Sequence, residues 1–565
     1  REARELHRAL AETLTRACEG TDEELFEHRR AAGDALLAAA AAERAAARAA
    51  ERFLLGRAAA LYRAAIDLRG GTDRAPWIGL GDALARDGRG AEAARAYHEA
   101  ASRAGGPAET AWLRERAASE LLRSGYVERG REAMDAVLRS LGLGTPSRML
   151  GLVVLLLWTR LGLLLGVRGR RGATERALLR VDACWSAATG LAGDPVRFAT
   201  HQARHLLLAR QAGEPRRLAR AKVAEVLLSA MSRGGDAPAT RRAIARARAA
   251  AGEAGDASVA ILAQGIEGVA AYLAGRFPEA RDGLIRADAS LAASPVASAW
   301  ERDTFRFFTL ESLAYEGRLR ELRERITQLV PEAEQRGDRY AATMMRTGIQ
   351  SLAWLADDDP REVRHQVELA ARVWTPRGFH VQHFLHLYAL VSADLYEGRG
   401  ADALARVTRP ADDGTGPSMR EAWLLCRGVP FLRVAMAYLR GRAALSAAQG
   451  ASPRGRAAAH AIARREARML ARRPEPLARA YAAALRGAAA LASGDRTSAA
   501  VALREAEAGF SSLGMCLFAA AASRALAAAE GDVRGARGAA ALAVFSRELV
   551  RRPERLAETL LPVGA

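Results

Sequence analysis

The feature that most constrains the fold of this chain is a fixed spacing of large apolar and small residues within segment 77–100. The residues at these spaced positions are Trp77, Leu80, Gly81, Leu84, Gly88, Ala93, Tyr97 and Ala100. Gly81 and Ala93 are small enough for two helix backbones to cross closely at their positions. Gly88 falls where a helix end often needs the left-handed backbone conformation. The spacing therefore predicts two antiparallel helices joined by a short turn.

The same spacing, W-x2-L-G-x2-L…G…A-x3-Y-x2-A, is that of the tetratricopeptide repeat. Further good copies carry the residues Gly268, Gly275 and Ala280, and Gly487, Gly494 and Ala499. Weaker copies occur around residues 58–65, 121–137, 313–326, 354–370 and 398–407. We therefore predict an all-α, tetratricopeptide-like helical-repeat solenoid, a superhelix of antiparallel helix pairs.

The composition agrees with an all-α chain. Alanine, the best helix former, dominates the apolar residues, aromatics make up only 5%, and no stretch alternates apolar and polar residues as a strand would. The formal net charge of +19 favours an acidic partner. Yet Lys222 is the only lysine, and arginine alternates with glutamate along most helices, as on solvated helix faces. These patterns favour a protein or peptide partner in a concave groove over nucleic acid.

Turn-rich breaks divide the predicted array. They lie at 169–172, 234–238 (GGDAP), 411–417 (ADDGTGP) and 450–455 (GASPRG). We expect N-terminal repeats over 1–145, an apolar helix and degenerate helix pairs over 146–235, central repeats over 236–412, and C-terminal repeats with a cap over 413–565. None of the breaks is long enough for a free linker, so we predict one continuous solenoid.

Segment 149–167, MLGLVVLLLWTRLGLLLGV, is long and apolar enough for a membrane span, and RGRR follows it. Arg160 near its middle opposes insertion by about 2.5–3.5 kcal/mol. A single span would also separate two halves of one array. We therefore favour a helix that is buried or faces a partner, and we keep membrane association as an alternative.

We find no catalytic site and expect no cofactor. A P-loop needs GxxxxGK[ST], but no glycine-rich loop precedes the only lysine, in ARAKVAEV. A kinase needs a glycine-rich loop, a strand lysine, HRD and DFG. The four cysteines form no CxxC pair, so we expect buried thiols in a reducing cytosol. The charged N-terminal residues do not read as a signal peptide, and the start at Arg1 predicts a piece of a longer protein.

Histidines give the only candidate metal ligands. His201 and His205 stand one helical turn apart, but no glutamate follows His201 as HExxH requires. His380, His383 and His386 recur every third residue and drift around the predicted helix by about 60° per step. Packing histidines explain both clusters more simply, so a metal-dependent enzyme that uses His380, His383 and His386 is kept only as an alternative.

Several phrases resemble the region that follows the ATPase module in bacterial, myxobacterial-type multidomain regulators. These proteins join a serine/threonine protein kinase domain to a STAND-type P-loop ATPase and then to tetratricopeptide-like repeats. The matching segments are 5–68, 181–191 (VDACWSAATGL), 202–215 (QARHLLLARQAGEP), 336–348 (RGDRYAATMMRTG), 377–384 (RGFHVQHF) and 551–562 (RRPERLAETLLP). The resemblance implies a cytoplasmic, C-terminal sensor and scaffold region.

Together these observations predict a non-catalytic module for protein interaction or ligand sensing. Its partners would be an acidic peptide segment in the groove and the upstream kinase and ATPase modules of the same polypeptide. None of the catalytic residues of those modules has a counterpart in this sequence, so none is assigned here.

Overall fold

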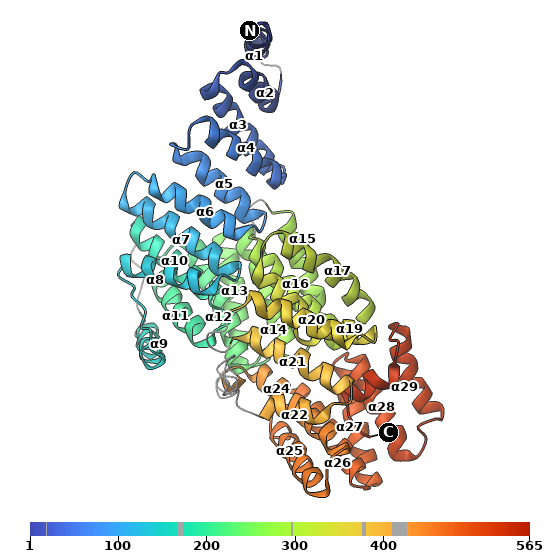
Figure 1. The fold of residues 1–565 in the computed structure, drawn as a ribbon. Helices are drawn as coiled ribbons and strands as arrows, with labels where there is room; N and C mark the ends of the chain where they lie inside the picture. The colour runs from blue at the N-terminus through green and yellow to red at the C-terminus, as the bar shows by residue number, and fades with distance from the viewer. Residues whose placement is uncertain (18–19, 167–173, 295–297, 376–379, 409–425, 565) are drawn as a thin grey trace.

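The computed structural model describes residues 1–17, 20–166, 174–294, 298–375, 380–408 and 426–564. Within these ranges the chain forms helices and no strand, and most helices follow one another as antiparallel pairs (Figure 1). The predicted all-α helical-repeat fold is confirmed. The predicted breaks at 169–172 and 411–417, and Cys18, lie outside the described residues.

The first third of the array runs from the N-terminus to a single inserted helix. Its helices are α1 (Glu2–Ala17), α2 (Asp22–Ala32), α3 (Ala35–Glu51), α4 (Leu55–Leu68), α5 (Arg74–Arg86), α6 (Gly90–Ser102), α7 (Pro107–Arg123), α8 (Val127–Ser140) and α9 (Met149–Leu164). The first four project from the rest of the molecule as an arm (Figure 1). We call α1–α4 the N-terminal arm.

The remaining helices, from α5 onward, form the body. Its central part contains α10 (Glu175–Gly190), α11 (Pro195–Ala212), α12 (Pro215–Arg233), α13 (Pro238–Ala254), α14 (Ala257–Leu273), α15 (Phe277–Ala292), α16 (Ala299–Glu316), α17 (Leu319–Gln335), α18 (Arg339–Arg346), η1 (Gly348–Ser351), α19 (Leu352–Ala356), α20 (Pro360–Val373), α21 (Val381–Tyr396) and α22 (Gly400–Thr408). The C-terminal part contains α24 (Pro430–Gln449), α25 (Pro453–Ala471), α26 (Pro476–Ala492), α27 (Arg496–Ser512), α28 (Cys516–Glu530), α29 (Ala536–Arg547) and α30 (Pro553–Leu560).

The helices stack as the repeat spacing requires. Each first helix packs on its own second helix, as in α5 with α6, α14 with α15 and α26 with α27. First helices of successive pairs also touch, as in α12 with α14 and α24 with α26. This order buries a continuous apolar layer, because each pair covers the apolar face of its neighbour.

The body coils back on itself, so that segments far apart in sequence meet. The Arg339 N–H donates to the Ser124 carbonyl at 3.0 Å, and the Val381 N–H donates to the Gly193 carbonyl at 3.3 Å. At the C-terminal end, Tyr438 Oη donates to the Leu560 carbonyl at 2.7 Å. These contacts close the coil in a way that pairing of sequence neighbours does not require.

In the described part of the chain the buried apolar side chains form five clusters, and the two largest lie in different parts of the array. One contiguous core runs from Trp185 to Val563, and a separate core runs from Phe26 to Leu113. The predicted boundary at 145 falls between α8 and α9, and the boundary at 235 falls between α12 and α13. The boundary at 412 lies outside the described residues.

Helix α9 interrupts the pairing, since α8 and α10 contact each other around it while α9 packs on α11. Of the two alternatives favoured for 149–167, a buried helix is wrong, since only Leu152 and Thr159 are buried, and a helix that faces a partner stays a prediction. The side chains of Leu164, Leu150 and Trp158 are 83%, 76% and 74% exposed. Among the described residues, no helix combines the length and apolar character that a membrane crossing needs.

The cysteines also correct one expectation. Cys184 and Cys426 are buried as predicted, but Cys516 is exposed. It is the first residue of α28, where the chain turns at the surface after Gly514.

Candidate functional site

A groove of about 530 Å³ follows the first helices of successive pairs. Side chains from α5, α7, α10, α12 and α14 line it, and Glu301 at the start of α16 closes one end. Each of these helices contributes residues one or two turns apart, because side chains three or four positions apart share a helix face. The array thus presents one helix face per repeat to a shared surface.

The groove carries charges of both signs. Its arginines are Arg86, Arg116, Arg123, Arg216, Arg217 and Arg220, and its acids are Asp82, Glu115, Glu120, Asp182 and Glu301. Three of the arginines form ion pairs within the groove, Arg116 with Asp82 at 2.8 Å, Arg217 with Asp182 at 2.6 Å and Arg123 with Glu120 at 3.8 Å. Arg216 pairs with Asp256 beside the groove at 2.9 Å. Such arginines are already engaged and offer little free charge.

Arg220 differs from these paired arginines. Its guanidinium lies over the ring of Trp185 at 5.2 Å from the centroid. Within the described residues it makes no hydrogen bond or close ion pair, and Glu301 and Asp182 attract it only at longer range. Burial lowers the pKa of Arg220, since removal from water disfavours the charged form. The groove therefore holds a partly buried cation that has no close carboxylate partner among the described residues.

Arg86 extends this pattern toward α5. One of its terminal nitrogens is buried without a hydrogen-bond partner among the described residues. The guanidinium lies 5.6 Å from the ring centroid of Phe53. A buried N–H without an acceptor costs about 1–3 kcal/mol, so an incoming oxygen acceptor would be favoured here.

The carboxyls of Glu115 and Glu120 lie on the acidic side of the groove. Burial raises the pKa of the Glu115 and Glu120 carboxyls, and Arg123 opposes the rise. Glu115 also receives a hydrogen bond from Ser186, which lowers its pKa. Both carboxyls therefore ionise less readily than a solvated glutamate does.

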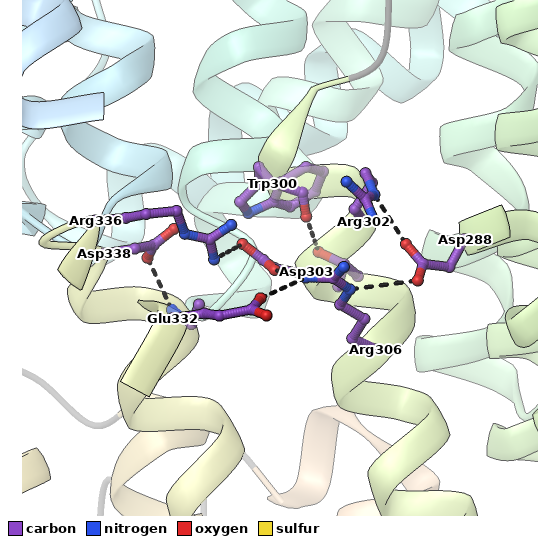
Figure 2. A network of polar contacts seen from close by, with 10 residues as sticks. Asp288, Trp300, Arg302, Asp303, Arg306, Glu332, Arg336 and Asp338 are labelled. Carbon is purple, nitrogen blue, oxygen red and sulfur yellow. Dashed lines mark hydrogen bonds and ion pairs between the residues drawn. The ribbon is translucent and has the colours of Figure 1, made fainter. Parts of the chain in front are cut away.

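A buried polar network lies at the end of the groove, where α16 meets the turn between α17 and α18 (Figure 2). Arg336 pairs with Asp303 at 2.8 Å, and Arg306 lies 3.5 Å from the same carboxylate. Asp338 caps α18 by accepting from the Ala341 N–H at 2.9 Å. Burial raises the pKa of Asp303 and of Asp338, and the charge of Asp303 raises the pKa of Asp338 further because like charges repel.

This network also joins two distant parts of the array. The side chain of Arg336 lies against Gly88, where a Cβ atom would come within 3.0 Å of Arg336 Cδ. Gly88 has a φ of +78°, so both its backbone conformation and its neighbour favour glycine. Gly88 therefore ends a helix and also receives a side chain from the far side of the coil.

The residues of the three good repeat copies occupy equivalent places. Gly81 lies against Tyr97, Gly268 against Leu284 and Gly487 against Leu503, with a residue sixteen positions further along the chain in each case. The built Cβ positions would be 2.6, 2.9 and 2.6 Å from the nearest atoms of those side chains. The other repeat-spacing residues that are buried are Leu80, Leu84, Ala93, Tyr97, Ala100, Ala280 and Ala499.

Trp77 and the turn glycines complete the pattern. Trp77 is half-buried, and its indole N–H donates to the Gly71 carbonyl at 3.3 Å. Gly275 and Gly494 have φ values of +81° and +83°. Each stands seven residues after the small residue at its helix crossing, as Gly88 does after Gly81.

The histidine clusters lie in the packed interior. His380, His383 and His386 have ring centroids 5.6 and 6.1 Å apart in sequence order. His383 accepts from the His380 N–H at 2.9 Å, and burial lowers its pKa to about 4. Among the described residues, no group of three His, Cys, Asp or Glu side chains is placed to hold a metal ion.

His201 and His205 are also buried, on α11. Burial lowers the pKa of each to about 3, so both are neutral at physiological pH. His205 Nδ1 lies 3.2 Å from Gln202 Oε1, and the ring is 5.4 Å from that of Trp185. This places His205 behind the tryptophan that carries Arg220.

Sequence reasoning did not single out Arg220, Trp185 or Arg336 as groove residues. Arginine occurs on nearly every helix, so its type alone carries no signal. The tryptophan offered one, because Trp185 is one of only 8 tryptophans and stands in an otherwise small-residue helix, ACWSAATG. A large ring at a first-helix position implies a surface that packs on something other than the next helix.

The sequence matches no known protein-family profile, and no curated protein matches it significantly. Among solved structures, the crystal structure of the APC/C hetero-tetramer Cut9-Hcn1 contains a similar chain. It aligns over 92% of this chain and 92% of that chain, with 11% identity and a TM-score of 0.39. The fold assignment made here depends on the helix pairs described above and not on that likeness.

Proposed function

We propose that this chain is a non-catalytic protein-interaction module whose groove binds an acidic, extended segment of a partner protein. The observation that carries the proposal is Arg220, a partly buried cation in the groove without a close carboxylate partner in the described part of the chain. A carboxylate from a partner would accept two parallel N–H bonds from its guanidinium. The ring of Trp185 holds the guanidinium plane for that contact.

The shape of the groove fits an extended peptide. It passes along several successive first helices rather than into a single closed pocket. Paired arginines such as Arg217 lie beside Arg220, and they would orient further acidic residues without losing their own partners. Repeat arrays present such elongated concave surfaces to bind segments of other chains.

The test is fluorescence anisotropy with a labelled twelve-residue peptide that alternates Asp and Ser, against the same peptide with Asn in place of Asp. The acidic peptide should bind, with an affinity that falls as salt rises, because the contact is partly exposed. Arg220→Gln should weaken binding about tenfold or more, since one charge-assisted hydrogen bond contributes about 1.5–3 kcal/mol.

The matched control is Arg248→Gln. Arg248 lies outside the groove and pairs with Glu267, so its loss should leave the affinity unchanged. Equal binding of the Asn peptide, or equal binding by the Arg220→Gln protein, would contradict the proposal.

The resemblance to bacterial regulators supports a finer proposal, that the groove regulates kinase and P-loop ATPase modules in the same polypeptide. Occupation of the groove would favour one of two arrangements of those modules. The reading frame that precedes Arg1 tests this: kinase and Walker motifs are expected there, and their absence would remove the support for the regulatory role.

A further inference from the structure

A separate cavity of about 130 Å³ lies where α14, α16, α21 and the start of α24 meet. Its walls are almost entirely apolar side chains from these helices. Leu262 and Glu301 line both this cavity and the groove, so the two spaces adjoin. The cavity is distinct in character, because the groove is lined mainly by charged residues.

Aromatic residues are concentrated around the cavity. The whole chain has 13 Phe, 10 Tyr and 8 Trp, and ten of these residues line this one space. The ring of Tyr272 lies 4.8 Å from that of Phe431 and 5.1 Å from that of Phe308. Tyr315 lies 5.9 Å from Phe431. In a chain with so few aromatics, this gathering exceeds what helix packing needs elsewhere in the array.

One buried carboxyl stands in this aromatic wall. The side chain of Glu311 is fully enclosed by protein, and the residue is 4% exposed. Tyr272 Oη donates to one carboxyl oxygen. The other oxygen, Oε1, is buried and has no hydrogen-bond partner among the described residues. A buried acceptor of this kind costs free energy until a donor reaches it.

The charged side chains that line the cavity are both acidic. Glu311 and Glu301 line it, and none of the lysine or arginine side chains that the structure describes does. An anionic ligand would meet a carboxylate, whereas a neutral apolar ligand would leave Glu311 Oε1 unsatisfied. A cation satisfies the carboxylate and is attracted to the negative faces of the rings. We propose that this cavity binds a small organic ammonium ion with an apolar body, through Glu311 and the surrounding aromatic rings.

The volume limits the size of the ligand. An engineered cavity of about 150 Å³ in another protein binds benzene, so a space of about 130 Å³ holds roughly one six-membered ring or a short branched chain. Burial raises the pKa of Glu311 from 4.5 to about 7, and Tyr272 opposes the rise. Ammonium binding should therefore expel a proton from Glu311 near neutral pH.

The probe is benzylammonium, measured by isothermal titration calorimetry on the full chain, beside its neutral isostere ethylbenzene and the anion benzoate. Benzylammonium should bind more tightly than either. Its association constant should rise about tenfold between pH 6 and pH 8, as Glu311 with a pKa of about 7 ionises. Equal affinity for ethylbenzene, or no binding of benzylammonium at millimolar concentration, would overturn the proposal.

Two variants sharpen the test. Glu311→Gln should abolish the pH dependence and reduce the affinity at pH 8 at least tenfold. Tyr272→Phe removes the hydrogen bond that lowers the pKa of Glu311, so the midpoint of the pH dependence should move to higher pH. Unchanged binding by the Glu311→Gln protein would also overturn the proposal.

The matched control is Glu316→Gln. Glu316 lies on the same helix, and burial raises its pKa to about 7 as well, but it pairs with Arg281 and does not line the cavity. Its substitution should leave benzylammonium binding and its pH profile unchanged. An equal loss in the Glu316→Gln protein would assign the effect to the helix as a whole and overturn the site. Failure of peptide binding in the groove would leave this result untouched.

Discussion

The N-terminal arm and the body use the same repeat spacing but pack in different ways. In the arm, the buried residues of α3 are all alanines, and the helices contact their sequence neighbours. In the body, rings from distant helices meet, as where Tyr438 stacks on Tyr481 with centroids 3.8 Å apart. Small residues at helix crossings thus specify pairing, whereas large side chains decide whether pairs also pack across the coil.

This difference has a consequence for cooperativity. A stack whose units touch only their neighbours can open from its free end one unit at a time. A coil closed by contacts such as Arg339 with Ser124 has to break distant contacts together. We therefore expect the arm to open locally and the body to unfold as a unit.

Phenylalanine truncation should show the largest contrast. Phe518 in the body is buried among the rings of Tyr438, Tyr481 and Phe510, whereas Phe26 is the buried ring of α2 in the arm. Phe518→Ala should lower the free energy of unfolding of the body by about 3–5 kcal/mol, because removal of the Phe518 ring leaves a cavity among its three neighbours. Phe26→Ala should leave the main urea transition in place. Circular dichroism should then show a loss of helical signal from the arm alone. A shift of the main transition by Phe26→Ala would contradict the separation of the two regions.

The pH dependence of the free energy of unfolding should arise in the body. The pKa of Glu311 is raised from 4.5 to about 7 by burial, so the folded state holds a proton that the unfolded state releases. This contribution is fully present below pH 4.5 and is lost as pH rises through 7, amounting to about 3 kcal/mol.

Urea unfolding at pH 5 and pH 8 measures this difference, with Glu311→Gln as the comparison. The variant should lose about 3 kcal/mol of the pH dependence of the main transition. An unchanged pH dependence would show that Glu311 is not buried as described.

Two glycines with nearly the same backbone separate conformational strain from coil closure. Gly125 and Gly494 have φ values of +82° and +83°. A Cβ at Gly125 would lie 2.6 Å from the Tyr340 nitrogen, whereas Gly494 faces open space. Gly494→Ala should cost about 1–2 kcal/mol from strain alone. Gly125→Ala should cost about 1–3 kcal/mol more, because it also forces the junction apart. Equal thermal destabilisation would argue against a close junction.

The exposed face of helix α9 should give the smallest effect. Trp158 is 74% exposed, so Trp158→Gln should change the free energy of unfolding by less than about 0.5 kcal/mol. Leu152 on the same helix is 1% exposed, and Leu152→Ala should cost about 2–3 kcal/mol. A large loss from Trp158→Gln in chemical denaturation would mean that the exposed face packs on the protein.

The sequence predicted the helix pairs well because their signal is local. Gly81, Gly268 and Gly487 each meet a side chain sixteen residues further on, within one helix pair. The closure of the coil was not predictable in the same way. Arg336 approaches Gly88 across about 250 residues, and nothing in either local pattern names the other.

The candidate site was likewise predictable only in part. A groove along first helices could be expected from the repeat, but Arg220 differs from the paired arginines of the groove in lacking a close acid, which depends on tertiary positions. Of the two alternatives for segment 149–167, burial was wrong, because apolar character alone does not tell whether a helix packs on its own chain or faces a partner. Its neighbours α8 and α10 pair without it.

Native-state hydrogen exchange resolved by peptide tests the central claim most directly. Amides of α2, α3 and α4 should exchange through openings of progressively higher free energy from the N-terminus inward. Amides of α14, α16, α24 and α28 should share one larger opening free energy, because the coil is closed. A single common opening free energy for arm and body, or a graded series through the body, would contradict the account.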